Sequence, residues 1–216
     1  MRSWARLIVT AAFLVPAPLA GQIAVGARAS TLGIGAELSI RAASLVGFRL
    51  GGNYFQLSRD VTIESNRYTA TPHFENGTAI VDLYPFGGSF HLSGGAILNY
   101  NEGKLSAHQP FTFEGRTYSS SEVTELSGTV TFKRTAPYLG IGFAGQGRLA
   151  LVFDIGVGFT GTPLATLSAQ HTLQGVERAE FEARLESEEA RVQEEIERRR
   201  WLRYHPVVSI GFKVGF

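Results

Sequence analysis

The chain has 216 residues, with 20 Lys and Arg against 19 Asp and Glu, so its length suits a single domain and its charge gives no basic field that would favour nucleic acid as a partner. It contains no Cys, which excludes a disulfide scaffold and a thiolate metal site. Gly (25), Phe (15) and Tyr (7) are abundant, and all-β barrels of this length are commonly single domains.

The N-terminal segment has the features of an export signal. Two arginines precede an apolar run over 7–15, and the small residues of "PAPLAGQ" follow it. The apolar run is too short to span a bilayer as a helix, and the prolines would break the alternative, a buried N-terminal helix. We therefore predict a signal peptide over 1–21, cleaved near Ala20 or Gly21, and a mature domain over 22–216.

Beyond the signal, the hydrophobicity alternates with a period of two residues, which indicates β-strands. The alternation covers 32–40, 46–51, 148–160 and 207–216, and a further strand is predicted over 22–29. One face of these segments is apolar, whereas the other carries Gly, Ala and Ser with single charges. Small residues suit the crowded interior of a narrow barrel whose apolar side faces lipid.

Short turns and long connections alternate along the chain. The turns are predicted at 42–44, 86–87 and 145–147, and the long connections run roughly over 57–67, 104–130 and 163–203. This asymmetry is typical of outer-membrane barrels, which have an even number of strands in bacteria. The predicted fold is therefore all-β: an eight-stranded antiparallel up-and-down transmembrane β-barrel, with one long charged α-helix in its last long loop.

The predicted turns also fix a strand register. It places Glu37 opposite Arg49, Asp82 opposite His91, and Tyr138 opposite Asp154, all on the inner face. Outward aromatic residues fall into two groups, which we expect to form girdles at the edges of an apolar band. The group near the turns is Phe48, Phe90, Phe143 and Phe216, and the group near the loops is Tyr54, Tyr100, Phe159 and Tyr204.

The last strand carries alternating apolar residues up to the final position: Ile210, Phe212, Val214 and Phe216. This pattern resembles the C-terminal assembly signal of outer-membrane β-barrel proteins, which the barrel assembly machinery reads. The mature chain as a whole resembles the small eight-stranded group that includes OmpA-, OmpX- and OmpW-type barrels and opacity-like proteins. "YPFGGSFHLSGG" (84–95) and "APYLGIGF" (136–143) are also similar to segments of uncharacterised bacterial members of that group.

The resemblance implies an outer-membrane location in a Gram-negative-type bacterium. Outer-membrane lipid and lipopolysaccharide would surround the protein, and the barrel assembly machinery and periplasmic chaperones would be its partners during biogenesis. The long charged helix is absent from the best-known members, so their functions do not carry over to this chain.

Parity along the strands predicts a set of inward charges. An eight-stranded barrel is only wide enough for its own side chains, so we expect these charges to pair and to fill the lumen. The predicted members are Arg28, Glu37, Arg49, Asp82, His91, Arg134, Asp154 and Lys213.

His91 and Ser93 are two residues apart on one strand and resemble the His and Ser of lipid A deacylase barrels. With a carboxylate such as Asp82, they could act as base and nucleophile. Parity directs both into the lumen, however, whereas a lipid substrate needs them on the membrane side. We therefore predict a structural role for them and no enzyme, and the five His show no spacing that would hold a metal. No cofactor is predicted.

The segment 174–203 is predicted to form a helical insertion. Ala, Glu and Arg favour a helix there, with i,i+4 Glu–Arg pairs in the favourable order. A thin apolar stripe of Phe181, Leu185, Val192 and Ile196 would let the helix lean on the barrel rim or self-associate as a short coiled coil. The basic residues that follow could contact lipopolysaccharide phosphates or merely complement the helix dipole. This group is Arg198, Arg199, Arg200, Trp201 and Arg203.

The function that fits these observations is a structural or surface-interaction role in the outer membrane, carried by the long loops. An enzyme acting on outer-leaflet lipid and a small-ligand-binding or transport barrel are the alternatives. The side of the barrel wall on which His91 and Ser93 lie distinguishes the alternatives. A His and Ser on the membrane side would favour the enzyme, and an apolar cavity in the lumen would favour a ligand-binding barrel.

Overall fold

The computed structural model describes residues 22–63, 66–107, 111–113 and 116–216, so the predicted signal peptide lies outside the described residues. Fourteen strands and two helical segments follow one another in the described part of the chain. The strands are β1 (Gln22–Ser30), β2 (Gly33–Arg41), β3 (Val46–Gln56), β4 (Arg59–Ile63), β5 (Asn66–Leu83), β6 (Phe90–Asn99), β7 (Glu102–Ala107), β8 (Phe111–Phe113), β9 (Arg116–Tyr118), β10 (Val123–Thr131), β11 (Thr135–Ala144), β12 (Leu149–Gly158), β13 (Leu164–His171) and β14 (His205–Gly215). The helical segments are α1 (Gly175–Arg198) and the 3-10 helix η1 (Arg200–Arg203).

Twelve of the strands form one antiparallel sheet, and eight of the twelve pair in a cycle that returns to its start. The cycle, here called the ring, runs β1, β2, β3, β5, β6, β11, β12, β14 and back to β1. The other four strands, β4, β7, β10 and β13, enlarge the sheet beyond the ring. The sheet is therefore larger than the eight strands that the sequence predicted.

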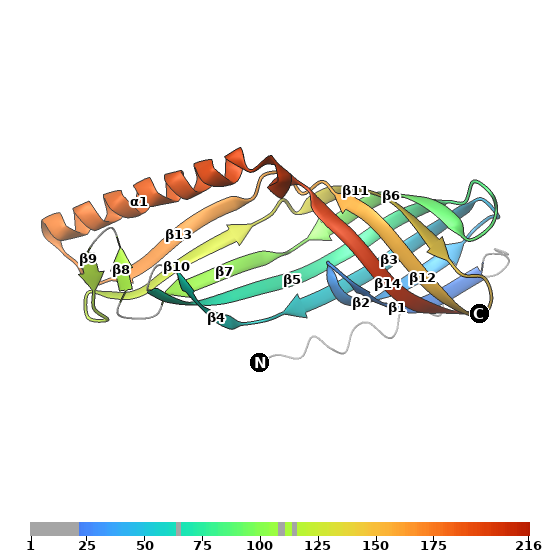
Figure 1. Cartoon of the computed structure of the whole chain (residues 1–216), viewed down its shortest axis with the longest axis horizontal. Helices are drawn as coiled ribbons and strands as arrows, with labels where there is room; N and C mark the ends of the chain where they lie inside the picture. Colours follow the sequence, from blue (N-terminus) through green and yellow to red (C-terminus); the bar gives the residue numbers. More distant parts are fainter. Residues whose placement is uncertain (1–21, 64–65, 108–110, 114–115) are drawn as a thin grey trace.

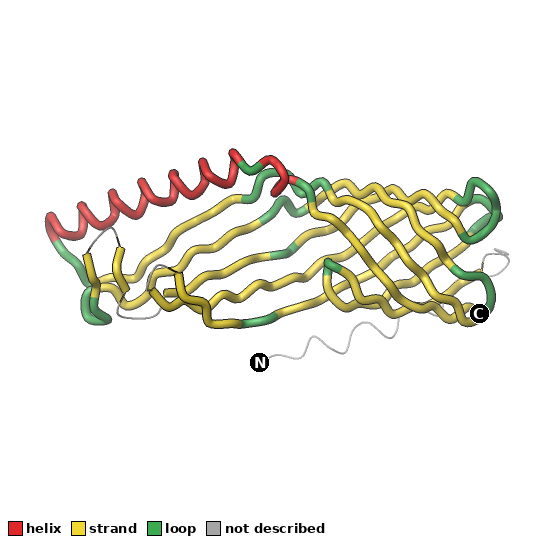
Figure 2. The backbone as a smooth tube through the Cα atoms, in the orientation of Figure 1, coloured by secondary structure: helices red, strands yellow, loops and turns green. Residues whose placement is uncertain are grey.

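The four additional strands and the first half of β5 form an extension at one end of the ring. Within it β13, β10, β7, β5 and β4 pair in that order. Figure 1 shows the molecule as an elongated body, with the ring and its short turns at one end and the extension at the other. The same view as a tube shows strands running through most of that length, with α1 beside the extension (Figure 2).

The regions predicted as long connections supply the extension. Residues 104–130 contain most of β7 and β10, and residues 163–203 contain β13 as well as α1. These strands were missed because one of their faces carries Ser and Thr rather than large apolar side chains. The alternation is still visible in β10, where Leu126, Gly128 and Val130 interleave with Ser127 and Thr129.

The two faces of the ring have opposite chemistry. Outward side chains are apolar and exposed: Leu50 is 59% exposed and Leu151 is 74% exposed. Inward positions of the same strands hold buried polar groups, among them Arg49 at 4% and Asp154 at 2% exposure. Aromatic rings also pair at both ends of this apolar surface, as Phe90 with Phe143 and Phe159 with Tyr204. This arrangement, with apolar side chains outside and polar side chains inside, is the opposite of that in a water-soluble β-sandwich.

The outer face changes character where β5 passes from the ring into the extension. In the ring, the outward residues of β5 include Val81 and Ala79, whereas the same parity in the extension gives Thr71 and Thr69. The strand register aligns hydroxyl-bearing and charged side chains in rows across this face. One row is Thr71, Lys104, Thr129 and Thr166, and the next is Thr69, Ser106, Ser127 and Ser168. The extension therefore has a surface suited to water.

The predicted register was wrong in all three hairpins, although the predicted faces were right. Arg49 pairs with Ser39 rather than Glu37, and Asp82 pairs with Ser93 rather than His91. In the third hairpin, Tyr138 pairs with Gly158 rather than Asp154. The connections, at 42–45, 84–89 and 145–148, are longer than predicted. Each pairing moves by an even number of residues, which leaves every side chain on its original face.

A second hydrophobic core lies in the extension, apart from the ring. The β8–β9 hairpin and α1 cover the sheet face that continues the inner face of the ring. Phe181 of α1 is 1% exposed, and its ring centroid lies 5.3 Å from that of Tyr118 and 5.2 Å from that of His171. The buried members of this core are Tyr118, Val123, Leu126, Leu173 and Phe181. Phe181 and Leu185 of the predicted apolar stripe therefore pack within the chain, and self-association through α1 stays a prediction.

Helix α1 also covers the free edge of β13, along which it runs in Figure 1. An edge strand presents unpaired backbone groups that invite association with other chains. Two side chains of α1 accept hydrogen bonds from this edge: Glu189 from the Leu167 amide at 2.6 Å and Gln193 from the Ala165 amide at 3.0 Å. Among the described residues, no helix is both long and apolar enough to cross a membrane.

Replacing both edge-covering side chains, in a Glu189→Ala, Gln193→Ala variant, should loosen α1 without unfolding the ring. Each lost hydrogen bond to a neutral amide contributes ~1 kcal/mol, so local opening of the helix should rise about tenfold or more. Limited trypsin digestion at the helix arginines measures this opening. The matched control is Glu180→Ala, Glu186→Ala, which changes two exposed glutamates of the same helix. Equal cleavage rates in the two variants would refute the edge-covering role.

Candidate functional site

The centre of the ring holds a cluster of charged side chains contributed by six different strands. Glu37 comes from β2, Arg49 from β3 and Asp82 from β5. Arg28 comes from β1, His91 from β6 and Asp154 from β12. Each of these strands places a polar residue inward between apolar outward neighbours, so the alternation itself positions the cluster.

Arg49 lies in the middle of this interior cluster. Its Nε is 2.6 Å from Asp82 Oδ2, and its Nη2 donates to Asp82 Oδ1 at 2.8 Å and to Ser93 Oγ at 3.0 Å. Nη1 lies 3.2 Å from Asp154 Oδ2 and 3.5 Å from Glu37 Oε2. The guanidinium therefore meets three carboxylates, and its contact with Asp82 combines a charge-assisted hydrogen bond from Nη2 with a close ion pair at Nε.

Asp154 joins the other half of the cluster. Arg28 pairs with its Oδ2 and also lies 2.9 Å from Glu37 Oε1 through Nη2. His91 Nε2 lies 2.8 Å from Asp154 Oδ1. Ser209 donates to Asp154 Oδ2 at 3.3 Å. Every charged group in the cluster thus has a partner of opposite charge, as burial requires.

Glycine makes room for these contacts. A Cβ on Gly142 would lie 2.5 Å from both His91 Nε2 and Asp154 Oδ1, so only glycine allows the wall to approach their hydrogen bond. Ser93 was expected in the lumen with a structural role but was not counted among the network charges, and Ser209 was not predicted as a site residue. Each serine lies at an inward position of its strand and pairs with a predicted charged residue, Ser93 with Asp82 and Ser209 with Asp154. That position is the signal that identifies them.

Two of the eight predicted charges lie elsewhere. Arg134 precedes β11 in an exposed connection and stacks over the Tyr100 ring at 5.1 Å. It was assigned to the lumen because the alternation of inward and outward residues was extended to a position that precedes the strand. Lys213 does face inward from β14, but nearer the turn end, and it makes no ion pair with any described residue. Parity predicts the face of a residue but not whether a counter-charge lies at the same height.

His91 and Ser93 do not form a base–nucleophile pair. Both are buried inside the ring, at 1% and 5% exposure. Ser93 donates to Asp82 at 2.7 Å, while His91 contacts Asp154. Each side chain is satisfied by a carboxylate, and neither reaches the apolar outer surface. No group of three or more metal-ligating side chains occurs within the described ranges.

An apolar layer lies inside the ring on the loop side of the charged cluster. Its six buried residues are Leu32, Ile80, Ile97, Ala136, Tyr138 and Val207. Leu32, in the β1–β2 turn, belongs to this layer, and its carbonyl accepts a hydrogen bond from Asn76 at 2.9 Å. A cavity of about 30 Å³ lies between this layer and the charged cluster, lined by Ile97 and Tyr138 on one side and by Arg28 and Asp154 on the other. It has room for only one or two water molecules.

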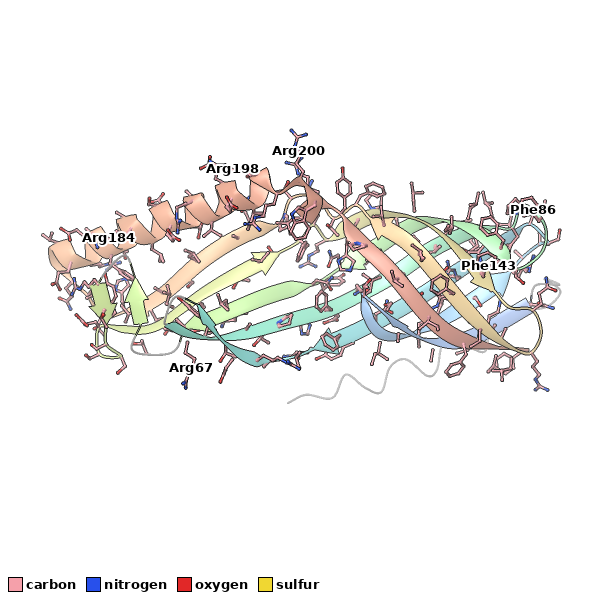
Figure 3. The ribbon with its side chains drawn as sticks, viewed as in Figure 1. Arg67, Phe86, Phe143, Arg184, Arg198 and Arg200 are labelled. Carbon is pink, nitrogen blue, oxygen red and sulfur yellow. The ribbon has the colours of Figure 1, made fainter. Side chains whose placement is uncertain are left out.

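The predicted lipopolysaccharide-contact residues lie where α1 meets β14. Arg198 donates to Glu194 at 2.6 Å, and Arg199 pairs with Glu195 at 2.8 Å. The hydrogen bond from Arg198 to Glu194 raises the pKa of Arg198. Arg200 and Arg203 are exposed and make no side-chain ion pair in the described part of the chain, and Trp201 is 66% exposed. Figure 3 shows Arg198 and Arg200 pointing away from the sheet.

The predicted assembly-signal residues lie on the outer surface of β14. Ile210 is 61% exposed, Phe212 is 51% exposed and Phe216 is 79% exposed. Val214 pairs with Val25 of β1 and Leu149 of β12. These residues form part of the apolar outer face of the ring, and their reading by an assembly machinery stays a prediction.

Two solved structures from Acinetobacter baumannii resemble most of the chain. CarO2 is 19% identical with a TM-score of 0.59, covering 90% of this chain and 98% of CarO2. CarO is 19% identical with a TM-score of 0.59, covering 93% of this chain and all of CarO (100%). A major outer membrane protein from Thermus thermophilus is 15% identical with a TM-score of 0.49, covering 91% of this chain and 100% of that protein.

No protein-family model and no curated protein sequence matches the chain. The neighbours in structure are outer-membrane β-barrel proteins. At this identity the likeness to CarO and CarO2 shows a shared fold, which agrees with the predicted antiparallel β architecture. The eight-stranded transmembrane barrel stays a prediction.

The cluster around Arg49 should show strong coupling between Arg49 and Asp82. Breaking a buried ion pair by removing one partner costs ~3–5 kcal/mol, because the other charge is left unpaired. Arg49→Met and Asp82→Asn should each lower the urea midpoint of the folded protein in micelles. The double variant should be far more stable than the sum of the two losses implies.

The matched comparison is the cycle between Arg49 and Glu37, whose 3.5 Å contact is longer. We expect a smaller coupling there. Heat-modifiable gel mobility reports the folded fraction at each urea concentration. If the losses of stability are additive in both cycles, Arg49 has no preferred partner.

Proposed function

We propose that the protein is an outer-membrane protein with a structural or surface-interaction role, in which an eight-stranded transmembrane barrel carries an exposed platform. The observation that carries this proposal is the inversion of the ring, with Leu50 and Leu151 exposed outside and Arg49 and Asp154 buried inside. Such a surface is stable against lipid and not against water. On this proposal, the turns lie in the periplasm and the extension projects from the cell.

A closed lumen supports this role over transport. The charged cluster and the apolar layer each fill the cross-section, with only a cavity of about 30 Å³ between them. The interior of an eight-stranded barrel is only just wide enough for its own side chains. The enzyme alternative is weakened because His91 and Ser93 are each bonded to a carboxylate inside the ring.

Function then falls to the extension, which presents hydroxyl-bearing and charged side chains beyond the apolar surface. The arginines between α1 and β14 are suited to lipopolysaccharide. They follow the helix and directly precede Tyr204, whose ring lies 5.8 Å from that of Phe159 in an exposed aromatic pair. Guanidinium groups at that level could bind the phosphates of the outer leaflet in bidentate fashion.

Membrane orientation can be tested cleanly because the chain has no Cys. A Ser168→Cys variant places a thiol on the extension, and a Gln146→Cys variant places one in an exposed turn at the other end. A membrane-impermeant maleimide applied to intact cells should label only Ser168→Cys, and lysed cells should give labelling of both. Labelling of Gln146→Cys alone in intact cells, or recovery of the protein outside the outer-membrane fraction, would overturn the proposal. The purified protein should also show no stable conductance in planar bilayers.

The lipopolysaccharide contact predicts a difference between two pairs of arginines. Arg200→Gln, Arg203→Gln removes the two that have no ion-pair partner among the described residues, whereas Arg198→Gln, Arg199→Gln removes two that are paired with glutamates. The two variants change the net charge equally. The first should weaken binding to purified lipopolysaccharide roughly tenfold at low salt and less at high salt, and the second should have little effect. Equal losses would indicate a general charge effect, and unchanged binding in both would reject the contact.

A further inference from the structure

The turn end of the ring contains a cavity that differs from the closed centre. It has a volume of about 40 Å³ and is lined by residues of five ring strands, including Arg41, Arg49, Asp82 and Lys213. A wider opening shares four lining residues with it: Gln22, Arg41, Gln146 and Gly147. The cavity is therefore reached from the turn side, whereas the charged cluster and the apolar layer separate it from the loop side.

The charges that line this cavity do not balance. Its one carboxylate, Asp82, is 1% exposed and is held by Arg49 through contacts of 2.6 and 2.8 Å. Arg41 and Lys213 have no carboxylate partner in the described part of the chain. The ring interior as a whole holds four basic groups, Arg28, Arg41, Arg49 and Lys213, against the three acidic groups Glu37, Asp82 and Asp154. The excess positive charge is located at the turn end.

Arg41 is fixed in place although it has no counter-ion among the described residues. Its Nη2 donates to the carbonyl oxygens of Ser44 at 2.7 Å and Gly87 at 2.8 Å, and the guanidinium lies 4.0 Å from the Tyr84 ring centroid. These contacts tie the β2–β3 and β5–β6 connections together. They leave the positive charge of Arg41 uncompensated at the cavity wall, and Lys213 on β14 adds a second.

We propose that this turn-end cavity binds one small inorganic anion, with Lys213 as its principal ligand and Arg41 as a fixed neighbouring charge. A half-buried cation is stabilised when it is paired, and no acidic side chain among the described residues lines the cavity apart from the engaged Asp82. The volume of about 40 Å³ admits an ion of the size of chloride or bromide and excludes a large organic anion. The amide groups of Gln22 and Gln146 at the opening supply further donors.

The test uses chloride as the probe, with the full-length protein refolded in detergent micelles. Exchange of chloride with a protein site broadens the ³⁵Cl resonance. Wild type should therefore show an excess linewidth that grows in proportion to the protein concentration and falls when bromide displaces the bound chloride. Gluconate at the same ionic strength should not displace it. Lys213→Gln should reduce the excess broadening roughly tenfold, as expected for the loss of a charged hydrogen-bond donor.

The matched control is Arg148→Gln, which removes an exposed arginine at the same end of the ring and should leave the broadening unchanged. Equal effects of the two substitutions, or displacement by gluconate as effective as by bromide, would overturn the proposal. Lys213→Arg retains the charge and should retain the broadening, and its loss of broadening would equally reject Lys213 as the ligand. The wild-type competition remains decisive if Lys213→Gln does not fold.

Discussion

The position of the Arg49 guanidinium among three carboxylates is the constraint on which the ring depends. Its partners Glu37, Asp82 and Asp154 come from β2, β5 and β12, so one side chain connects distant parts of the wall. A buried cation and buried carboxylates are each unstable alone, and they are satisfied together only when the strands are in one register. The apolar outer face cannot supply that selection, because an outward surface of Leu, Ile and Phe accepts many registers equally well. We infer that the interior charges select the strand register, whereas the outer face determines which solvent the ring tolerates.

The sequence predicted the chemistry of the ring better than its geometry. Period-two alternation identifies which residues share a face, and it assigned Arg28, Glu37 and Asp154 correctly to the interior. It does not determine how many residues a turn consumes, so the cross-strand partners of Arg49 and Asp82 were misplaced by two positions. Alternation also gives no height along the barrel axis. For that reason Lys213 was grouped with charges that it does not contact, and the apolar layer around Tyr138 was not foreseen.

The extension was missed for a different physical reason. Its strands carry Ser and Thr on one side and a mixture of Gly, Ala, Val and Leu on the other, so their alternation has low contrast and their composition resembles that of loops. The helix over Gly175–Arg198 was predictable, since propensity and i,i+4 pairs act within the segment. Its location was not, because Glu189 and Gln193 bond to the backbone of β13, a strand that the sequence did not reveal. Local interactions could thus be inferred from the chain, and interactions with an unrecognised strand could not.

Strand β5 belongs to both the ring and the extension, and this continuity has a mechanical consequence. It pairs with β3 from His73 to Leu83 and with β7 from Tyr68 to His73, so the two regions share one uninterrupted backbone. Hydrogen bonds in an antiparallel sheet lie perpendicular to the strands, so a pull along β5 stretches many of them at once instead of opening them one after another. Tension applied to the extension, by flow or by attachment to another surface, would be distributed over the wall of the ring. The extension is thus connected to the ring as a stiff element that transmits tension, which a flexible loop of the same length would not do.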